Sequence, residues 1–248
     1  MNAGLDGYFK ITERGSTFRR EVLAGLTTFM TMAYILVIHP VWMASGAGMD
    51  RGASIVVTAL MSGVFSLFMG VYANLPFSLA PAMGGNAFFA FTLVKGGIVS
   101  WQVGMGMVFI SGTVFVLLSV FGIRELIVRL VPRSIKFGIG VAVGFFIAYL
   151  ALKDAGFIAF TNNGIKMGSL YEPKAILGLV GLCITSVFMA RKVPGGILLS
   201  IVITAAVGIP MGITKIPASF VAMPASIDPI AFKLDILGAL KVAYIPFI

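Results

Sequence analysis

The chain has 248 residues, of which 59% are hydrophobic and 11% charged, and its mean hydropathy is +1.05. A soluble domain carries about 25% charged residues, so this composition excludes a soluble globular protein. The net charge of +9 does not indicate nucleic-acid binding, because Lys and Arg lie in the N-terminal segment and in short loops between apolar stretches. A single cysteine, Cys183, provides no disulfide framework. We therefore expect an all-α polytopic membrane protein.

The apolar stretches predict about seven spans, of which the third is broken. In chain order the predicted spans are 22–43, 53–72, 75–98, 101–122, 135–152, 173–190 and 195–213. The expected parts are a cytoplasmic N-terminal segment at 1–21, spans one to four at 22–122, a cytoplasmic interfacial helix at 123–134, spans five to seven at 135–213, an extracytoplasmic loop at 214–236, and the start of a truncated eighth span at 237–248. A solvated connector is an equally good interpretation of residues 123–134. Clusters of Lys and Arg close to the span ends predict a cytoplasmic N-terminus.

The third span, 75–98, is the most informative element of the sequence. Pro76 and Pro81 each remove a backbone donor and disfavour helix before them, so the span should begin as an extended strand. Two glycines follow, and Asn86 is the expected N-cap of a half-helix that runs to about Ile98. Irregular backbone at membrane depth is tolerated only where protein or a watery cavity receives it. The pattern therefore predicts the binding site of a transporter, where free N–H groups bind an electronegative or anionic group.

Several side chains are candidates for such a site, each with a purely structural alternative. Asn86 is a candidate substrate ligand, although helix capping alone explains it. Phe88 is a candidate for stacking on a heterocycle, although packing explains it equally well. Thr31 and Tyr34 recur on one face of the first span and are candidates to line a polar cavity. Hydrogen bonding of Thr to its own helix is the commoner role.

Acidic residues are absent from the middle of every predicted span. Ion-coupled transport usually needs a buried ionisable group, so either the coupling residues lie beyond Ile248 or the protein couples to nothing. No span carries paired carboxylates, a Ser/His pair or metal-ligand spacing, so we expect neither an enzyme nor a metal or cofactor.

Three segments resemble the adenine–guanine–hypoxanthine permeases, a branch of the nucleobase–cation symporters in the xanthine/uracil permease superfamily. Residues 25–40 (GLTTFMTMAYILVIHP) resemble the first span of that branch, residues 79–91 (LAPAMGGNAFFAF) the third and residues 135–149 (IKFGIGVAVGFFIAY) the fifth. The second glycine of the third-span motif, Gly85, departs from the leucine expected there. The resemblance covers essentially the whole chain, and the first and third motifs are fairly specific.

The resemblance implies a fold and a site. Family members are about twice this length and have fourteen spans, arranged as two inverted seven-span repeats. Their substrate lies between the third and tenth spans, and their acidic residues lie mainly in the eighth and tenth. This chain then corresponds to the first repeat, with spans one to four as half of the substrate-binding core domain and spans five to seven as half of the gate domain. By motif, Asn86 faces a purine, and Gly85, Ala87 and Phe88 provide backbone and wall.

We therefore expect a secondary active transporter of purine nucleobases (hypoxanthine, guanine and adenine), coupled to H+ and working by alternating access. It should be a multi-pass protein of the plasma (inner) membrane. The expected partners are the lipid bilayer, a purine nucleobase, and a C-terminal half or second chain that supplies the acidic residues; a homodimer is left open, and no nucleic acid is expected. The alternatives are an anion transporter or channel of the same architecture and a non-functional truncated fragment.

Overall fold

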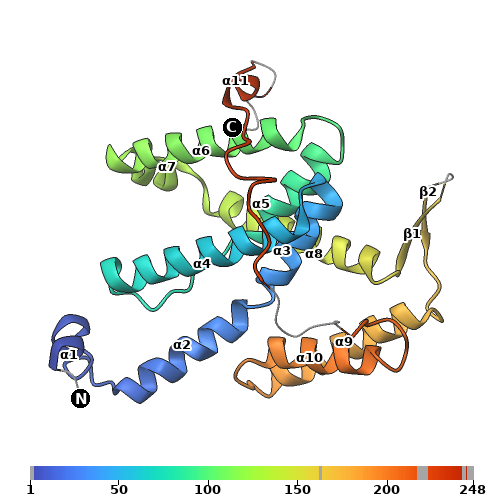
Figure 1. The fold of residues 1–248 in the computed structure, drawn as a ribbon, viewed down its shortest axis with the longest axis horizontal. Coiled ribbons are helices and arrows are strands. Elements are labelled where there is room, and N and C mark those ends of the chain that lie inside the picture. The colour runs from blue at the N-terminus through green and yellow to red at the C-terminus, as the bar shows by residue number, and fades with distance from the viewer. Residues whose placement is uncertain (1–2, 162–163, 217–222, 242–243, 245–248) are drawn as a thin grey trace. The chain divides into compact units, whose positions relative to one another are not determined.

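The computed structural model describes residues 3–161, 164–216, 223–241 and 244 (Figure 1). Within this part of the chain the only sheet has two strands, and the rest is helical or irregular. The elements are α1 (Ala3–Phe9), α2 (Phe18–Met32), α3 (Ile35–Ala47), α4 (Arg51–Ala73), α5 (Met83–Ala87), the π-helix η1 (Phe88–Val94), α6 (Trp101–Val120), α7 (Ile123–Leu130), α8 (Arg133–Asp154), β1 (Ile158–Thr161), β2 (Gly164–Met167), α9 (Pro173–Ala190), α10 (Gly196–Gly208) and α11 (Ile236–Ala239).

Among the described residues, five helices are long and apolar enough to cross a membrane when α2 and α3 are taken as one, Phe18–Ala47. Two shorter apolar helices, Met83–Val94 and Gly196–Gly208, bring the apolar segments to the predicted seven. The prediction of an all-α polytopic membrane protein is therefore confirmed. Helix α9 begins and ends at the predicted residues, and α4, α6 and α8 differ from their predicted ends by less than a helical turn.

The first span is not the single helix that the sequence predicted. A turn at residues 33–34 separates α2 from α3, and the N–H groups of Leu36 and Val37 donate three residues back instead of four. The hydroxyl of Thr31 donates to the carbonyl oxygen of Thr28 at 2.7 Å, and such bonds bend helices. Pro40, inside α3, also lacks the N–H that would continue the ladder. Both effects favour a break close to this point.

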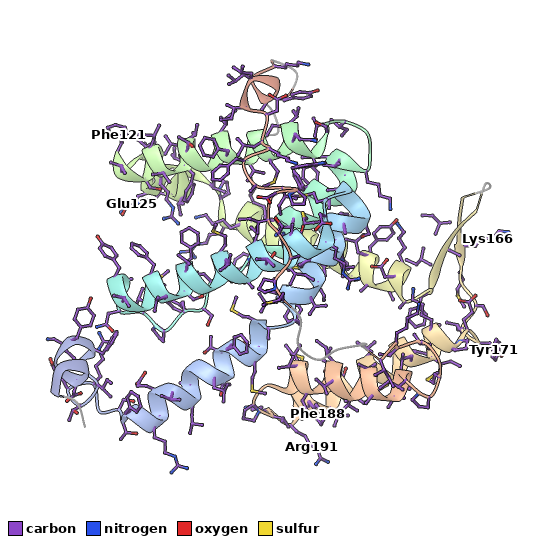
Figure 2. The ribbon with its side chains drawn as sticks, in the orientation of Figure 1. Phe121, Glu125, Lys166, Tyr171, Phe188 and Arg191 are labelled. Carbon is purple, nitrogen blue, oxygen red and sulfur yellow. The ribbon has the colours of Figure 1, made fainter. Side chains whose placement is uncertain are left out.

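The β-hairpin was not predicted. Strands β1 and β2 pair antiparallel from Ile158 opposite Met167 to Thr161 opposite Gly164, and residues 162 and 163 between them lie outside the described part. The sequence does carry a signal, because the run Asn-Asn-Gly at 162–164 follows an apolar run, and Asn and Gly are the residues that tight hairpin turns favour. The side chains of Lys166 on β2 and Tyr171 after it are exposed (Figure 2).

The chain divides into two compact units. The first contains Met1–Val37, Thr58–Pro81 and Leu152–Met223. In it α9 and α10 lie side by side (Figure 1), and Thr185 Oγ1 donates to the buried Ser200 Oγ at 2.8 Å. A Cβ at Gly181 would lie 2.9 Å from the side chain of Thr204, so the missing side chain lets the helices approach. Arg191, after α9, is exposed (Figure 2).

The second unit contains Ile38–Val57, Ala82–Ala151 and Pro224–Ile248, and its core surrounds α5 and η1. Ala87 packs with Trp42 of α3 and Leu150 of α8. Phe89 and Ala90 pack in a second cluster with residues of α3. The short apolar helix at the break is therefore the centre of this unit.

Two predictions about domains stay untested. The assignment of spans one to four and five to seven to core and gate halves concerns function, which the compact units do not address. The predicted loop at 214–236 and the eighth-span start at 237–248 fall partly on 217–222, 242–243 and 245–248, which lie outside the described residues. In the described part of that region α11 begins after Asp235, whose side chain accepts from the N–H of Gly238 at 2.8 Å.

Candidate functional site: a half-helix with unpaired donors

The third apolar segment is interrupted. Residues 74–82 form neither helix nor strand, and the helix then resumes at Met83 and ends at Val94. At 1.5 Å per residue this helix is about 18 Å long, a little over half of a hydrocarbon core of about 30 Å. The predicted broken span is confirmed, although its first part is irregular and not the predicted strand, and the helix ends before the predicted Ile98.

The predicted N-cap was wrong. Ala82, in extended conformation (φ −71°, ψ 110°), occupies the cap position, and its carbonyl oxygen accepts the backbone N–H of Asn86 at 3.1 Å. Asn86 thus lies inside the first turn. Its propensity for the cap is overridden because Pro81 fixes the backbone just before Ala82, and because burial of Ala87 stabilises a turn that contains two glycines.

Unpaired donors gather at this helix start. Among the described residues no acceptor binds the backbone N–H of Met83, Gly84 or Gly85, as expected for the first turn of a helix. The side-chain nitrogen Nδ2 of Asn86 is buried and also lacks an acceptor in the part of the chain described. A buried, unpaired amide donor costs about 1–3 kcal/mol, so this arrangement favours an acceptor that the chain itself does not supply.

The two glycines of the first turn face different surroundings. A Cβ at Gly84 would overlap Val143 Cγ1 on α8, so this glycine permits close packing of two helices. A Cβ at Gly85 would meet no atom within 4 Å, and Gly85 is exposed. Gly85 therefore offers a backbone surface that a planar ligand can approach closely.

The three phenylalanines of the motif have distinct positions. Phe89 is buried against α6, where a Cβ at Gly104 would lie 2.7 Å from its ring. Phe91 packs edge-on against Trp42, with ring centroids 5.9 Å apart. Phe88 is 41% exposed and begins the π-helix, a form frequent at functional sites. Of the three, Phe88 has the ring surface most available for stacking.

Thr31 and Tyr34 lie in the other compact unit, so the structure does not bring them together with Asn86. The hydroxyl of Thr31 donates to the carbonyl oxygen of Thr28 in its own helix, which is the common role of threonine in a helix. Tyr34 is partly buried in the turn between α2 and α3. Their roles in lining a cavity stay a prediction.

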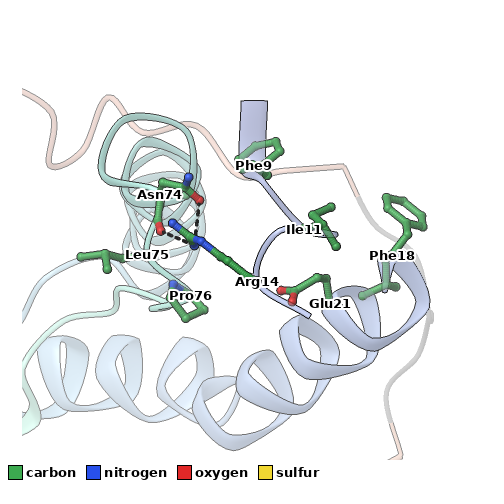
Figure 3. Close-up of a pocket in the computed structure, with 10 residues that line it drawn as sticks. Phe9, Ile11, Arg14, Phe18, Glu21, Asn74, Leu75 and Pro76 are labelled. Atoms are coloured by element: carbon green, nitrogen blue, oxygen red, sulfur yellow. Dashed lines mark hydrogen bonds between the residues drawn. The ribbon is translucent and has the colours of Figure 1, made fainter. Parts of the chain in front are cut away.

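The N-terminal segment binds the end of α4, a feature that the sequence analysis missed. Tyr8 Oη donates to the carbonyl oxygen of Val71 at 2.6 Å, and Arg14 Nη1 lies 3.5 Å from both the carbonyl and the side-chain oxygen of Asn74 (Figure 3). The last carbonyls of a helix lack partners, and a cation is favoured there. Asn74, at φ +50° directly after α4, is a typical residue at the end of a helix. It was the signal in the sequence that could have predicted where α4 ends. Arg14 and Asn74 border a cavity of about 420 Å³ that Phe9, Phe18, Glu21 and Pro76 also line.

Two acidic residues next to helices act as caps. Asp50 Oδ1 accepts the N–H of Ala53 at 2.7 Å at the start of α4, and Asp235 does the same for α11. Within the described residues no group of three or more His, Cys, Asp or Glu side chains is placed to hold a metal ion.

The sequence model of the xanthine/uracil permeases, described as the Permease family, matches residues 19–246. The chain is 38% identical to the adenine permease AdeP of Escherichia coli K12 over 95% of its own length and 53% of that protein. It is 37% identical to the guanine/hypoxanthine permease GhxP of Escherichia coli O157:H7 (98% of this chain, 55% of the relative). It is 35% identical to the guanine/hypoxanthine permease PbuG of Bacillus subtilis (90% of this chain, 52% of the relative). The chain spans about half the length of the curated relatives it matches, and it belongs to the purine branch of the xanthine/uracil permease family.

Proposed function

We propose that this chain forms part of a secondary active transporter of purine nucleobases, with hypoxanthine, guanine and adenine as substrates. The observation that carries the proposal is a group of donors, at Gly85 and Asn86, for which the described residues provide no acceptor; they lie at the start of a helix that is too short to cross the membrane. Purines present ring nitrogens and, in guanine, a carbonyl oxygen as acceptors. The names of the relatives, adenine permease and guanine/hypoxanthine permease, support the same substrate class.

Each site residue then has a role. Asn86 donates from Nδ2 to a purine acceptor, and Gly85 lets the base approach the backbone. Phe88 stacks on the ring. Ala87, fully buried against Trp42, holds this wall in place through the core. Thr31 and Tyr34 line the polar path to the base.

The coupling ion is H+, and transport proceeds by alternating access. The acidic residues that bind the proton come from a C-terminal half or a second chain, because a buried ionisable group is the usual requirement. Two observations support this partner. The chain matches only 53% of a relative such as AdeP, and only 6–17% of each span's apolar window is buried within the described structure. The remaining faces are left for lipid, for that partner, or for a second copy in a homodimer.

We place the protein in the plasma (inner) membrane. The N-terminus is assigned to the cytoplasm because Lys and Arg cluster in the N-terminal segment and close to span ends on the same side. Helix α7 lies in the cytoplasmic interface. It is exposed along its length, pairs Glu125 with Arg129 at 3.9 Å, and holds Arg124 5.0 Å from the ring centre of Phe115. Phe121 and Glu125 mark this region in Figure 2. Such an amphipathic surface suits the boundary between headgroups and acyl chains.

Uptake of radiolabelled hypoxanthine tests the proposal. The full-length protein that contains this chain is expressed in cells that lack their own purine permeases, and uptake is measured with and without a pH gradient. We expect uptake that adenine and guanine inhibit and that collapses when the gradient is removed. Absence of purine uptake by a correctly inserted protein contradicts the proposal.

An anion transporter or channel is the second candidate, favoured by the positive end of the half-helix dipole. Competition separates the two. Inorganic phosphate or sulfate at millimolar concentration should leave hypoxanthine uptake unchanged if the site is built for purines. An anion flux that hypoxanthine does not inhibit supports the alternative.

A further inference from the structure

One side chain holds the irregular segment before the half-helix. Ser66, on α4, contacts Leu79 thirteen residues later in the same compact unit. Its Oγ accepts the backbone N–H of Leu79 at 2.7 Å and donates to the carbonyl oxygen of Leu79 at 3.3 Å. A single hydroxyl therefore satisfies both backbone groups of a residue that belongs to neither helix nor strand.

Other hydroxyls on the apolar helices behave differently. Ser119 and Ser186 donate to the carbonyl four residues earlier, at 2.8 and 2.7 Å, which is the usual way for serine to satisfy its hydroxyl in a helix. The described hydrogen bonds of Ser66 lead to another segment instead.

The surroundings make this contact costly to lose. Leu79 is partly buried beside a cavity of about 190 Å³, bordered by α2, α4 and residues 78–80. Ser62, one turn before Ser66, also borders this cavity, and its buried Oγ has no partner among the described residues. Without Ser66 the N–H and carbonyl of Leu79 would lose the partners that the described residues provide, and an unpaired, partly buried backbone group is unfavourable.

We infer that Ser66 is a positioning residue of the transport site, an inference that rests on the proposed function. Leu79 precedes Met83, the first residue of the half-helix, by four positions in the chain. Ser66 and Leu79 lie in the first unit and Met83 in the second, so the link between them is the chain itself. Four residues of chain span at most about 14 Å, so the held Leu79 is a covalent anchor for the start of the half-helix. Ser66 touches no substrate; it acts by holding the backbone that leads into the site.

Transport kinetics test this inference in the full-length protein. We expect Ser66→Ala, which removes both hydrogen bonds to Leu79, to raise the KM for radiolabelled hypoxanthine about tenfold, because the productive position of the segment is then less populated. Ser66→Thr keeps the hydroxyl and should restore the KM to within about twofold. The matched control is Ser186→Ala, which removes a hydroxyl from α9 that bonds only its own helix and should leave the KM unchanged. A purely structural role would lower the amount of protein in the membrane and the Vmax with it, at constant KM, and that result overturns the inference.

A second measurement does not depend on purine transport. In a background in which Cys183 and every cysteine outside residues 1–248 are replaced by serine, Ser78→Cys places a single cysteine beside Leu79. We expect Ser66→Ala to increase the rate of maleimide labelling at this cysteine about fivefold, because the segment is no longer held. Faster labelling in a protein that moves no purine means that the proposed function fails while Ser66 still holds the segment. Unchanged labelling together with unchanged KM in an active transporter overturns the role of Ser66 alone.

Discussion

Replacement of Asn86 by alanine has opposite expected effects on stability and on substrate affinity. In the substrate-free protein the buried Nδ2 lacks an acceptor within the described structure, and burial of such a donor costs about 1–3 kcal/mol. Alanine removes this cost and is also the better helix former, by about 0.6 kcal/mol. Against this stands the lost packing of the amide, worth about 1 kcal/mol. The net expectation is a substrate-free protein more stable by about 1 kcal/mol, and a melting temperature higher by about 2–4 °C.

The affinity for hypoxanthine should fall in the same variant. If Nδ2 donates to the purine, Asn86→Ala loses one hydrogen bond of about 1 kcal/mol, and hypoxanthine should bind about fivefold to tenfold more weakly. Thermal unfolding of purified protein by tryptophan fluorescence provides the assay, because Trp42 packs in the same cluster as Ala87. The shift in melting temperature on adding hypoxanthine reports affinity. Asn86→Asp keeps the shape and removes the donor, and it should also weaken binding. A variant that melts at a lower temperature and binds hypoxanthine normally would refute this reasoning and make Asn86 a structural residue.

Gly84→Ala should destabilise the protein by about 1–3 kcal/mol, because its Cβ overlaps Val143, and Val143→Ala should restore the melting temperature. Gly85→Ala meets open space, so it should leave stability unchanged and reduce hypoxanthine uptake at least severalfold. Tyr8→Phe removes the 2.6 Å bond to the end of α4, worth about 1 kcal/mol, and should accelerate trypsin cleavage after Lys10 without changing the KM. Hydrogen bonds from the backbone and side chain of Thr12 lower the pKa of Asp6 below its ordinary value of 3.8. These bonds therefore stabilise the N-terminal segment at pH values above 3.8. Hydrogen exchange there should be constant from pH 7 to 5, once corrected for intrinsic rates, and rise only as the pH falls through the lowered value.

The sequence was sufficient to predict the membrane class, the family and the broken third span. These follow from patterns that act over many residues, such as apolar length, and from prolines, whose effect on the backbone is local and strong. The N-cap of the half-helix was predicted four residues late, at Asn86 instead of Ala82, because capping propensity is weak, about 1 kcal/mol, and packing of the buried Ala87, Phe89 and Ala90 outweighs it.

Other features depend on contacts between residues far apart in the chain. No local pattern relates Ser66 to Leu79, or Tyr8 to Val71, because each hydroxyl finds its partner only after the helices pack. The different surroundings of Gly84 and its neighbour are likewise set by α8. The hairpin, in contrast, had a local Asn-Asn-Gly signal that the prediction overlooked.

Substrate protection of a cysteine at Phe88 tests the central claim most directly. In a background in which Cys183 and every cysteine outside residues 1–248 are replaced by serine, Phe88→Cys places the only thiol on the exposed side of the half-helix. Full-length protein in membrane vesicles is labelled with a maleimide, with and without hypoxanthine at saturating concentration. The account predicts that hypoxanthine slows labelling severalfold, whereas inorganic phosphate does not. Equal labelling rates with and without hypoxanthine, in a protein that still transports it, would contradict a purine site at this helix start.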